Sequence, residues 1–409
     1  MTSIVAHDHS GSHRALLCEH ADHPPADIDA IIVPTARRPA YLKEAAGLAA
    51  ALGCTLVTLH SKKWTSAAAG ARIVPACVDL IAVDIPEPAK LRLPRWNTSR
   101  LLAGTAFARH TDLSAKRNLG LVLARLLGWS RILFLDDDIT ELRPADVRMA
   151  SGLLGLHSAV GLQVGGFPDH SMVCHAYKQA GGRQQSFIGG GALVVDVGRS
   201  TSFFPDVYND DWFFLLDGDK KLQSVAMTGH VRQYPYDPFS VERARAEELG
   251  DVLAEGIYWL LDRDKTIADA DQAYWERYLA RRRGFIGQVL EMVRKSGLKP
   301  DDEIRRVTAL KASLGRLTLI EPEFCVQYMR AWTTDWQRWQ SHLQRLTVRP
   351  DRPAALAMLS GRGASGLTFT IGGLAEPALE KSPPRVSVGP AGSDRDAWRA
   401  VAHAAASGR

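Results

Sequence analysis

Apolar runs and segments with helical periodicity alternate along the first part of the chain. Apolar, partly β-branched runs at 29–35, 54–59 and 132–135 predict buried strands of a parallel sheet, because such strands are covered on both faces. The segment 36–52 between the first two runs has the apolar spacing of a helix and is followed by Gly53, a typical helix end. We therefore expect a strand-helix-strand unit with a right-handed crossover.

The same α/β pattern continues to about residue 240. A helix is expected over 111–128, where Thr111 or Asp112 can cap the first turn and leucines and valines trace one apolar face. A second helix is expected over 144–156. The remaining apolar stretches predict strands at 78–85, 159–164, 187–196 and 222–227. The segment 95–110 shows neither pattern, which leaves an insert or a mobile flap open there.

Beyond residue 240 the pattern becomes helical. Helical periodicity with charged pairs four residues apart runs through three segments, 241–261, 271–296 and 301–346. The basic run 281–283 is expected on a solvated helix face. Trp332, Trp336 and Trp339 form one stripe on a helix, which predicts packing against the sheet domain, with an acceptor or interface surface as the alternative.

This patterning predicts four parts of the chain. Residues 1–27 are polar and rich in histidine, with irregular spacing that indicates a flexible leader rather than a metal site. Residues 28–240 are expected to form the α/β domain, and residues 241–348 a helical extension. Residues 349–409 are rich in Pro, Gly, Ala and Ser, which predicts a weakly ordered tail.

Composition limits the classes of function. The 409 residues include 50 Lys and Arg against 45 Asp and Glu, a net charge of +5, which suits anionic ligands but is too small to indicate nucleic-acid binding. Five cysteines without C-x-x-C pairing argue against a disulfide framework and favour a reducing compartment. No signal peptide or transmembrane run is evident, so we expect a cytoplasmic protein, with peripheral attachment to a membrane left open.

Three consecutive carboxylates, the acidic trio Asp136, Asp137 and Asp138, follow the apolar run 132–135. Ligands of open α/β sheets collect at the carboxyl ends of such strands, and mutually repulsive aspartates there do nothing for folding. Asp136 and Asp138 carry the hard oxygens that a divalent cation prefers, and such a cation can bridge a diphosphate. A solvated acidic turn is the competing interpretation.

Two cations begin the helix that precedes the acidic trio. Lys116 and Arg117 lie in the first turns of the helix expected over 111–128, where the helix dipole disfavours positive charge. A pocket for an anion explains this placement, and a solvent-facing pair of cations is the alternative.

Two further segments carry candidate chemistry. The glycines 189–191 precede a strand and allow a ligand to approach the backbone, with a structural bulge as the competing interpretation. Asp210 and Asp211 begin a very apolar helix; capping explains one of them, and a base with a pKa raised by desolvation explains a pair flanked by aromatic residues. His230 is a candidate metal ligand or phosphate contact, although a single loop histidine is more often neither.

Five motifs, in order, resemble those of GT-A-fold glycosyltransferases of the large family 2 group. Residues 33–42 look like the family's first strand and turn, and 115–118 look like its Ala-Arg-Asn element. Residues 135–138 are similar to the DxD site, 189–195 to the acceptor-side glycine segment, and 209–213 to the motif that carries the catalytic base. The resemblance covers the α/β domain and implies a Rossmann-like, mostly parallel central sheet flanked by helices, followed here by a C-terminal helical extension.

The resemblance also implies a metal-dependent transfer of a sugar from a UDP-, GDP- or dTDP-linked donor to a hydroxyl acceptor. It implies Mn²⁺ or Mg²⁺ held through Asp138, with Asp136 near the ribose or the metal. In an inverting enzyme Asp211, with Asp210 beside it, takes the acceptor proton. In a retaining enzyme His230 completes the metal site and Asp211 only orients the substrates.

Substrate contacts follow from the same motifs. The expected donor contacts are Pro34, Thr35, Arg37, Lys116, Arg117, Asn118, Asp136 and Asp137. The expected acceptor contacts are Gly189, Gly190, Gly191 and Trp212. No nucleic-acid partner is expected, and a homo-oligomer formed through the C-terminal helices is left open.

The chain departs from the family pattern at two motifs. His60 and Ser61 replace the acid that usually follows the second strand, which affects recognition of the nucleotide base. No Gln-x-x-Arg-Trp motif follows Asp211, which argues against a processive polysaccharide synthase.

Two other classes of function also fit the acidic trio. Asp136 and Asp138 after an apolar strand match the first motif of haloacid dehalogenase-type phosphatases, with Asp136 as nucleophile and Asp138 as acid. That motif normally opens its domain, whereas a strand-helix-strand unit and another helix precede it here. A non-catalytic nucleotide- or carbohydrate-binding relative is the third interpretation.

Overall fold

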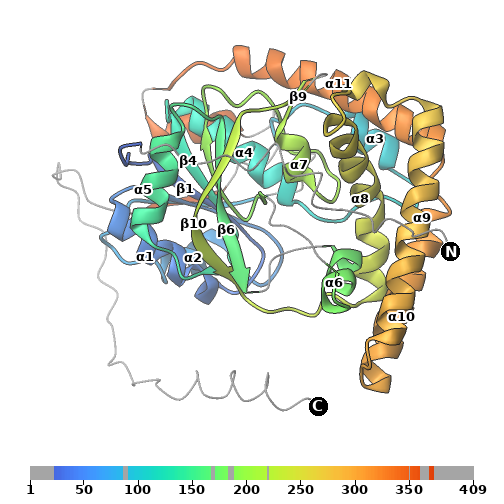
Figure 1. The fold of residues 1–409 in the computed structure, drawn as a ribbon. Coiled ribbons are helices and arrows are strands. Elements are labelled where there is room, and N and C mark those ends of the chain that lie inside the picture. The colour runs from blue at the N-terminus through green and yellow to red at the C-terminus, as the bar shows by residue number, and fades with distance from the viewer. Residues whose placement is uncertain are drawn as a thin grey trace, which may run out of the picture. The chain divides into compact units, whose positions relative to one another are not determined.

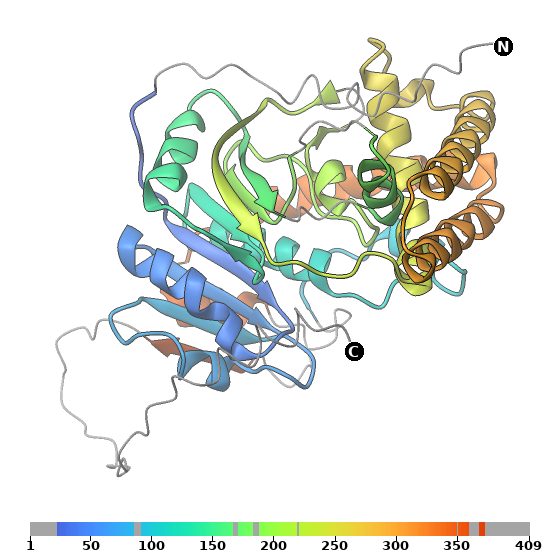
Figure 2. The same ribbon diagram turned by 60° about the horizontal axis from the view of Figure 1, so that its bottom comes forward.

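The computed structural model describes residues 23–85, 91–166, 171–182, 188–218, 221–349, 351–359 and 368–372. A central sheet carries helices on both faces, as Figures 1 and 2 show from two directions. Within these ranges no helix is long and apolar enough to cross a membrane.

The central sheet is mixed. Its nine strands are β1 (Ala30–Thr35), β2 (Thr55–His60), β3 (Leu80–Asp84), β4 (Arg131–Leu135), β5 (Ile139–Thr140), β6 (Ala159–Gly166), β7 (Ala192–Asp196), β10 (Val225–Gln233) and β11 (Thr368–Gly372), and their order is β11-β3-β2-β1-β4-β7-β6-β10-β5. Strands β1 to β4 are parallel to one another, and β6 and β10 run in the same direction as these four strands. Strands β5, β7 and β11 run in the opposite direction. The expected α/β class with a mostly parallel sheet is confirmed.

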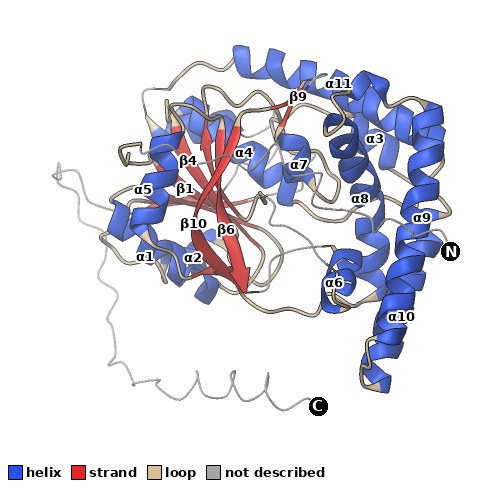
Figure 3. Cartoon of the chain, in the orientation of Figure 1, coloured by secondary structure: helices blue, strands red, loops and turns tan. Residues whose placement is uncertain are grey.

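Helices surround this sheet and continue beyond it (Figure 3). The described helices are α1 (Lys43–Leu52), α2 (Ala67–Ala71), α3 (Asn97–Leu102), α4 (Leu113–Leu126), α5 (Pro144–Leu153), α6 (Met172–Gln179), α7 (Asp210–Phe214), α8 (Val241–Leu261), α9 (Gln272–Lys295), α10 (Pro300–Leu317), α11 (Pro322–Gln344) and α12 (Arg352–Leu359). Two 3₁₀ turns, Pro39–Leu42 and Ile267–Asp269, and a two-stranded sheet of β8 (Leu216–Asp217) and β9 (Lys221–Leu222) complete the described elements.

Alternation along β1 sends its side chains to opposite faces of the sheet, as strand geometry requires. Ala30 and Ile32 belong to the hydrophobic core that includes α4, whereas Ile31 and Val33 belong to the core that includes α1 and α5. Helices α8 to α11 contribute their apolar faces to the first of these cores. The C-terminal helical extension is therefore packed into the same core as the sheet.

Most of the expected elements are present, and the differences come from pairings between distant segments. The segment 95–110 contains α3, whose Asn97 and Thr98 N–H groups both donate to the carboxylate of Asp335 on α11. The last strand expected at 222–227 is β10, which starts at Val225 and runs on to Gln233.

The expected leader and tail are described only in part. Residues 1–22 lie outside the described residues, as do 350, 360–367 and 373–409. The described parts of the tail segment are ordered: α12 adds apolar residues to the core that includes α4, and β11 pairs antiparallel with β3. Low apolar content thus did not prevent this segment from contributing an edge strand.

The tryptophan stripe on α11 is a packing feature. Trp332 and Trp339 are completely buried. The Trp332 ring lies 5.8 Å from that of Phe213, measured between centroids, and the Trp339 ring lies 5.9 Å from that of Trp96. The stripe joins the helical extension to α7 and α3, as the packing interpretation predicts.

The expectation that 281–283 is a solvated basic face is wrong for Arg282, which is completely buried. Its guanidinium donates to Glu248 (2.9 Å), Asp251 (2.7 Å) and Glu255 (2.8 Å), all on α8. Burial raises the pKa of Glu248 to about 7 and that of Asp251 to about 6, against the opposing effect of the arginine. The single cation Arg282 on α9 thus pairs with three carboxylates on α8 and joins the two helices.

We expect Arg282→Met to lower the free energy of unfolding by about 3–5 kcal/mol, because it leaves buried carboxylates without their cation. Chemical denaturation at pH 8 measures this loss. The loss should shrink at pH 6, because without the arginine that lowers them the carboxyl pKa values rise further, and the folded variant then takes up more protons than the folded wild type as the pH falls. Arg283→Met, at an exposed position of the same helix, is the control and should change stability by less than about 0.5 kcal/mol. Equal losses in the two variants would contradict the ion-pair account.

Candidate functional site

The acidic trio follows β4, beside the end of β1, and its last two members are hydrogen-bonded to the last residue of β1 and to the chain that follows it. Asp137 accepts hydrogen bonds from Thr35 Oγ1 (2.6 Å) and Arg37 Nη1 (2.6 Å). Asp138 accepts from Arg37 Nη2 (3.0 Å) and from Gln233 Nε2 (3.3 Å). The two carboxylates are therefore largely buried and hydrogen-bonded, which is not the behaviour of a solvated acidic turn.

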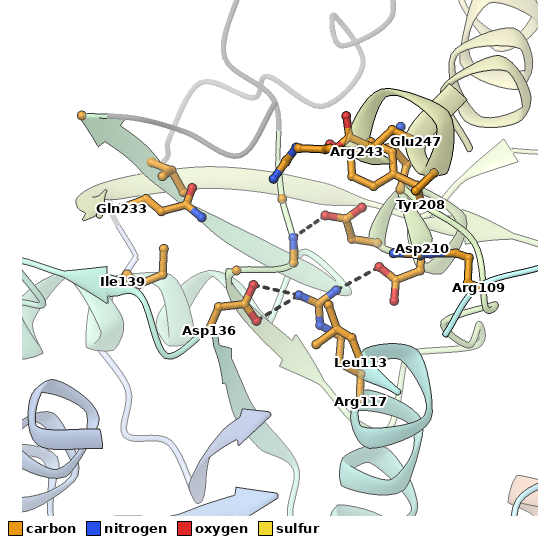
Figure 4. Close-up of a pocket in the computed structure, with 18 of the residues that line it drawn as sticks. Arg109, Leu113, Arg117, Asp136, Ile139, Tyr208, Asp210, Gln233, Arg243 and Glu247 are labelled. Atoms are coloured by element: carbon orange, nitrogen blue, oxygen red, sulfur yellow. Dashed lines mark hydrogen bonds and ion pairs between the residues drawn. The ribbon is translucent and has the colours of Figure 1, made fainter. Parts of the chain in front are cut away.

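Arg117 on α4 joins the acidic trio to the second acidic pair (Figure 4). Its Nη2 lies 3.1 Å from each carboxylate oxygen of Asp136, and its Nη1 donates to Asp210 over 2.9 Å. Burial opposes the positive charge, but the carboxylates of Asp136, Asp210 and Asp211 outweigh burial and raise the pKa of Arg117. A permanently charged guanidinium thus links β4 to α7.

The carboxyl of Asp136 is strongly perturbed. Burial raises its pKa to about 7, and the charges of Asp138 and Asp137 act in the same direction, whereas Arg117 opposes them. Within the described residues the Nε of Arg117 is buried without a hydrogen-bond partner. The site therefore contains carboxylates that favour additional positive charge, and the Nε–H group of Arg117 is able to donate one further hydrogen bond.

Asp211 has the environment of a base held in a fixed orientation. Its Oδ2 accepts the Gly190 N–H (2.6 Å), and its Oδ1 accepts the Trp212 N–H (2.9 Å). Burial and the neighbouring charge of Asp210 raise its pKa to about 6. Asp210 itself accepts a hydrogen bond from Ser114 Oγ (2.7 Å) in addition to its ion pair with Arg117.

The glycine segment allows these side chains to crowd against the backbone. A Cβ at Gly190 would lie 2.9 Å from Nη1 of Arg117 and 3.0 Å from Cβ of Asp211. A Cβ at Gly191 would lie 3.2 Å from Oδ2 of Asp136, and the Gly191 carbonyl accepts the Asp136 N–H (2.8 Å). The glycines are therefore needed for contacts within the site, whether or not a ligand also approaches them.

Helix α8 holds the turn that precedes α7. Asn209 adopts a left-handed conformation (φ 61°), and its side-chain amide donates to Asp251 over 3.0 Å. A Cβ at Gly250 would lie 2.2 Å from the carbonyl oxygen of Tyr208, so α8 presses directly against this turn. Asp251 is also a partner of Arg282, and the buried charges of the helical extension thus support the acidic pair.

A cavity of about 550 Å³ brings the two acidic motifs together (Figure 4). Its lining includes nine expected or neighbouring positions, Leu113, Arg117, Asp136, Gly189, Gly190, Gly191, Asn209, Asp210 and Asp211. It also includes residues that sequence reasoning missed, among them Arg109, Lys178, Tyr208, Gln233, Arg243 and Glu247. Gln233 lies at the end of β10, whereas the sequence predicts that this strand ends at residue 227.

Two of the expected donor contacts are structural supports. Lys116 is buried, and its ammonium donates to the carbonyl of Thr35 (2.8 Å) and to Ser61 Oγ (2.6 Å). The Asn118 amide donates to the carbonyl of Phe204 (2.7 Å) and accepts the N–H of the same residue (2.9 Å). Both side chains fasten α4 to neighbouring segments, and neither lines the cavity.

Seven other expected positions also lie outside the cavity lining: Pro34, Thr35, Arg37, Asp137, Asp138, Trp212 and His230. Pro34 is buried within β1, and the Trp212 ring packs on that of Tyr258 at 4.7 Å between centroids. His230 is exposed on β10 rather than in a loop, and its backbone N–H donates to the carboxylate of Asp146 (3.0 Å).

Among the described residues, no group of three or more His, Cys, Asp or Glu side chains is arranged to hold a metal ion.

Comparisons with known proteins give one kind of match. No family model and no curated protein sequence matches the chain. Eleven chains of solved structures match it. One is mannosyltransferase PcManGT from Pyrobaculum calidifontis in complex with GDP-Man and Mn²⁺, which is 13% identical with a TM-score of 0.39; the match covers 81% of this chain and 91% of that one.

We expect Gly190→Ala to destabilise the site. The methyl group would meet the guanidinium of Arg117, which cannot move aside because Asp136 and Asp210 hold it. The free energy of unfolding should fall by about 1–3 kcal/mol, measured by urea denaturation. Gly284→Ala is the matched control, because a Cβ at that helical position meets nothing within 4 Å and alanine favours the helix. A Gly190 variant as stable as this control would contradict the crowding.

Proposed function

We propose that this chain is a metal-dependent glycosyltransferase that moves a sugar from a nucleotide-diphosphate donor to a hydroxyl acceptor with inversion of configuration. The observation that carries the proposal is the joining of two acidic motifs by Arg117 in one cavity. The α/β fold, and the five motifs that resemble those of family 2 glycosyltransferases in their order along the chain, agree with it.

The acidic trio suits Mn²⁺ or Mg²⁺. We assign the cation to Asp136 and Asp138, whose carboxylates are hard oxygen ligands. The raised pKa of Asp136, caused first by burial and then by its acidic neighbours, indicates a site that gains from additional positive charge. When bound, such a cation neutralises charge on the departing diphosphate. His230 is not assigned to this site, because it is exposed on β10 and does not line the cavity.

Arg117 is the second group that we assign to the donor. Its two Nη atoms are held by Asp136 and Asp210, so the side chain has a fixed direction. Its Nε, which has no partner within the described residues, is left to donate to a phosphate oxygen. A pre-oriented cation of this kind stabilises a leaving group without reorganisation.

Asp211 is the proposed base. The acceptor hydroxyl oxygen attacks the anomeric carbon, the bond from that carbon to the diphosphate oxygen breaks, and the hydroxyl proton passes to the Asp211 carboxylate. The N–H groups of Gly190 and Trp212 fix the carboxylate during this step. The retaining alternative uses His230 as a metal ligand. Because His230 does not line the cavity, we propose the inverting mechanism.

We expect Asp211→Asn to reduce sugar transfer by about 10²–10⁴-fold with little change in donor affinity. Transfer is assayed with UDP-, GDP- and dTDP-sugars and Mn²⁺, and donor affinity by calorimetry. The wild-type rate should rise with pH around a midpoint near 6, because the base must be ionised and its pKa is raised to about 6. Asp217→Asn, at an exposed position on β8, is the control and should keep the wild-type rate and pH profile.

The rival classes give different results in the same assays. A phosphatase with Asp136 as nucleophile would hydrolyse an aryl phosphate with Mg²⁺ and would need no sugar nucleotide. A non-catalytic binding protein would bind a sugar nucleotide but would have no turnover for the Asp211 substitution to remove. Either outcome would overturn the transferase proposal.

A further inference from the structure

Arg37 covers the two members of the acidic trio that the cavity does not reach. Its Nη1 donates to Asp137 Oδ1 over 2.6 Å, and its Nη2 donates to Asp138 Oδ2 over 3.0 Å. The side chain of Arg37 is 45% exposed, whereas those of Asp137 and Asp138 are 8% and 11% exposed. The guanidinium therefore lies between these carboxylates and solvent, and neither aspartate lines the cavity.

This position conflicts with cation binding at Asp138. The oxygen that Arg37 contacts, Oδ2, also accepts a hydrogen bond from Gln233 Nε2 (3.3 Å), so donors already surround it. A divalent cation that used this oxygen would lie within a few ångströms of the guanidinium, where the like charges repel each other. Arg37 and a metal ion cannot both occupy Oδ2 of Asp138.

The guanidinium of Arg37 can move away from its carboxylate partners, whereas that of Arg117 cannot. The Arg37 side chain is half in water, and its only described ring contact is with Tyr41, at 5.4 Å from the centroid. The guanidinium itself loses little on returning to water, because its side chain is already half exposed. The charge that it leaves unpaired on the largely buried Asp138 is the charge that an incoming divalent cation would neutralise. Arg117 is buried, with Nη2 paired to Asp136 and Nη1 paired to Asp210. Its removal would leave these buried carboxylates unpaired.

We propose that Arg37 is a place-holding cation: it neutralises Asp137 and Asp138 before ligands arrive and is displaced from Asp138 when a divalent cation binds. The proposal rests on the metal-dependent function proposed above. The proposal has a consequence for binding order. A metal ion that binds alone displaces Arg37 into water, and the guanidinium then loses its anionic partner. A donor diphosphate that binds together with the metal ion offers the displaced guanidinium a new anionic partner. The cation should therefore bind weakly alone and more tightly together with the nucleotide.

The test is titration of the full-length protein with Mn²⁺ alone, with free Mn²⁺ measured by electron paramagnetic resonance. Arg37→Met removes the competing cation, and we expect Mn²⁺ to bind at least about tenfold more tightly than to the wild type. Arg38→Met is the matched control, since Arg38 is an exposed neighbour of the same charge, and its Mn²⁺ affinity should equal that of the wild type. Adding Asp138→Asn to the Arg37→Met variant should abolish the increase in Mn²⁺ affinity. This result would locate the additional Mn²⁺ binding at the Asp138 carboxylate.

Mn²⁺ affinity that is unchanged or weaker in Arg37→Met, or raised equally in Arg38→Met, would overturn the proposal. Circular dichroism checks that each variant folds, and Arg37→Gln, which removes the charge but keeps a hydrogen-bond donor, provides the same comparison should the methionine variant not fold. The outcome is separate from that of the proposed function. A wild-type protein without sugar-transfer activity would refute the transferase, whereas the Mn²⁺ titrations decide the role of Arg37.

Discussion

The ion pairs of Arg117 are the constraint on which the site depends. A guanidinium buried between Asp136 and Asp210 joins the end of a central strand to the start of α7. Burying these charges is costly unless each is paired, so the geometry tolerates little movement. Glycine at position 190 is required because Arg117 and Asp211 occupy the space a side chain would need. The side chains held by this pairing form part of the cavity wall.

Support for the acidic pair comes from the helical extension. Asn209 takes its left-handed conformation against Asp251, and Asp251 is held in turn by Arg282 on α9. The extension shares a hydrophobic core with the sheet, so its helices are part of the scaffold of the site. The buried cluster of one arginine and three carboxylates transmits that support through hydrogen bonds of defined geometry rather than through apolar contact alone.

Local chemistry made part of this site predictable from sequence. Consecutive charges at the end of an apolar strand or the start of a helix are visible in a single stretch, and the acidic trio, Arg117 and the acidic pair were found in this way. The direction of a side chain is not visible there: Lys116 and Asn118, which the sequence predicts at the donor, fasten α4 to neighbouring segments and lie outside the cavity lining. Arg282 did carry an overlooked signal, because it falls between Tyr278 and Phe285 on the apolar face of α9. The cavity residues on α8 depend on tertiary packing and had no such signal.

The most direct test of the account is anomalous diffraction from crystals of the full chain grown with Mn²⁺ and a nucleoside diphosphate. We predict one anomalous peak at about 2.1 Å from oxygens of the acidic trio and of the diphosphate, typical of a small hard cation. Arg117 should remain bonded to Asp136 and Asp210 in the same crystals. A nucleotide bound elsewhere, or a peak without any carboxylate of the trio as ligand, would contradict the central claim.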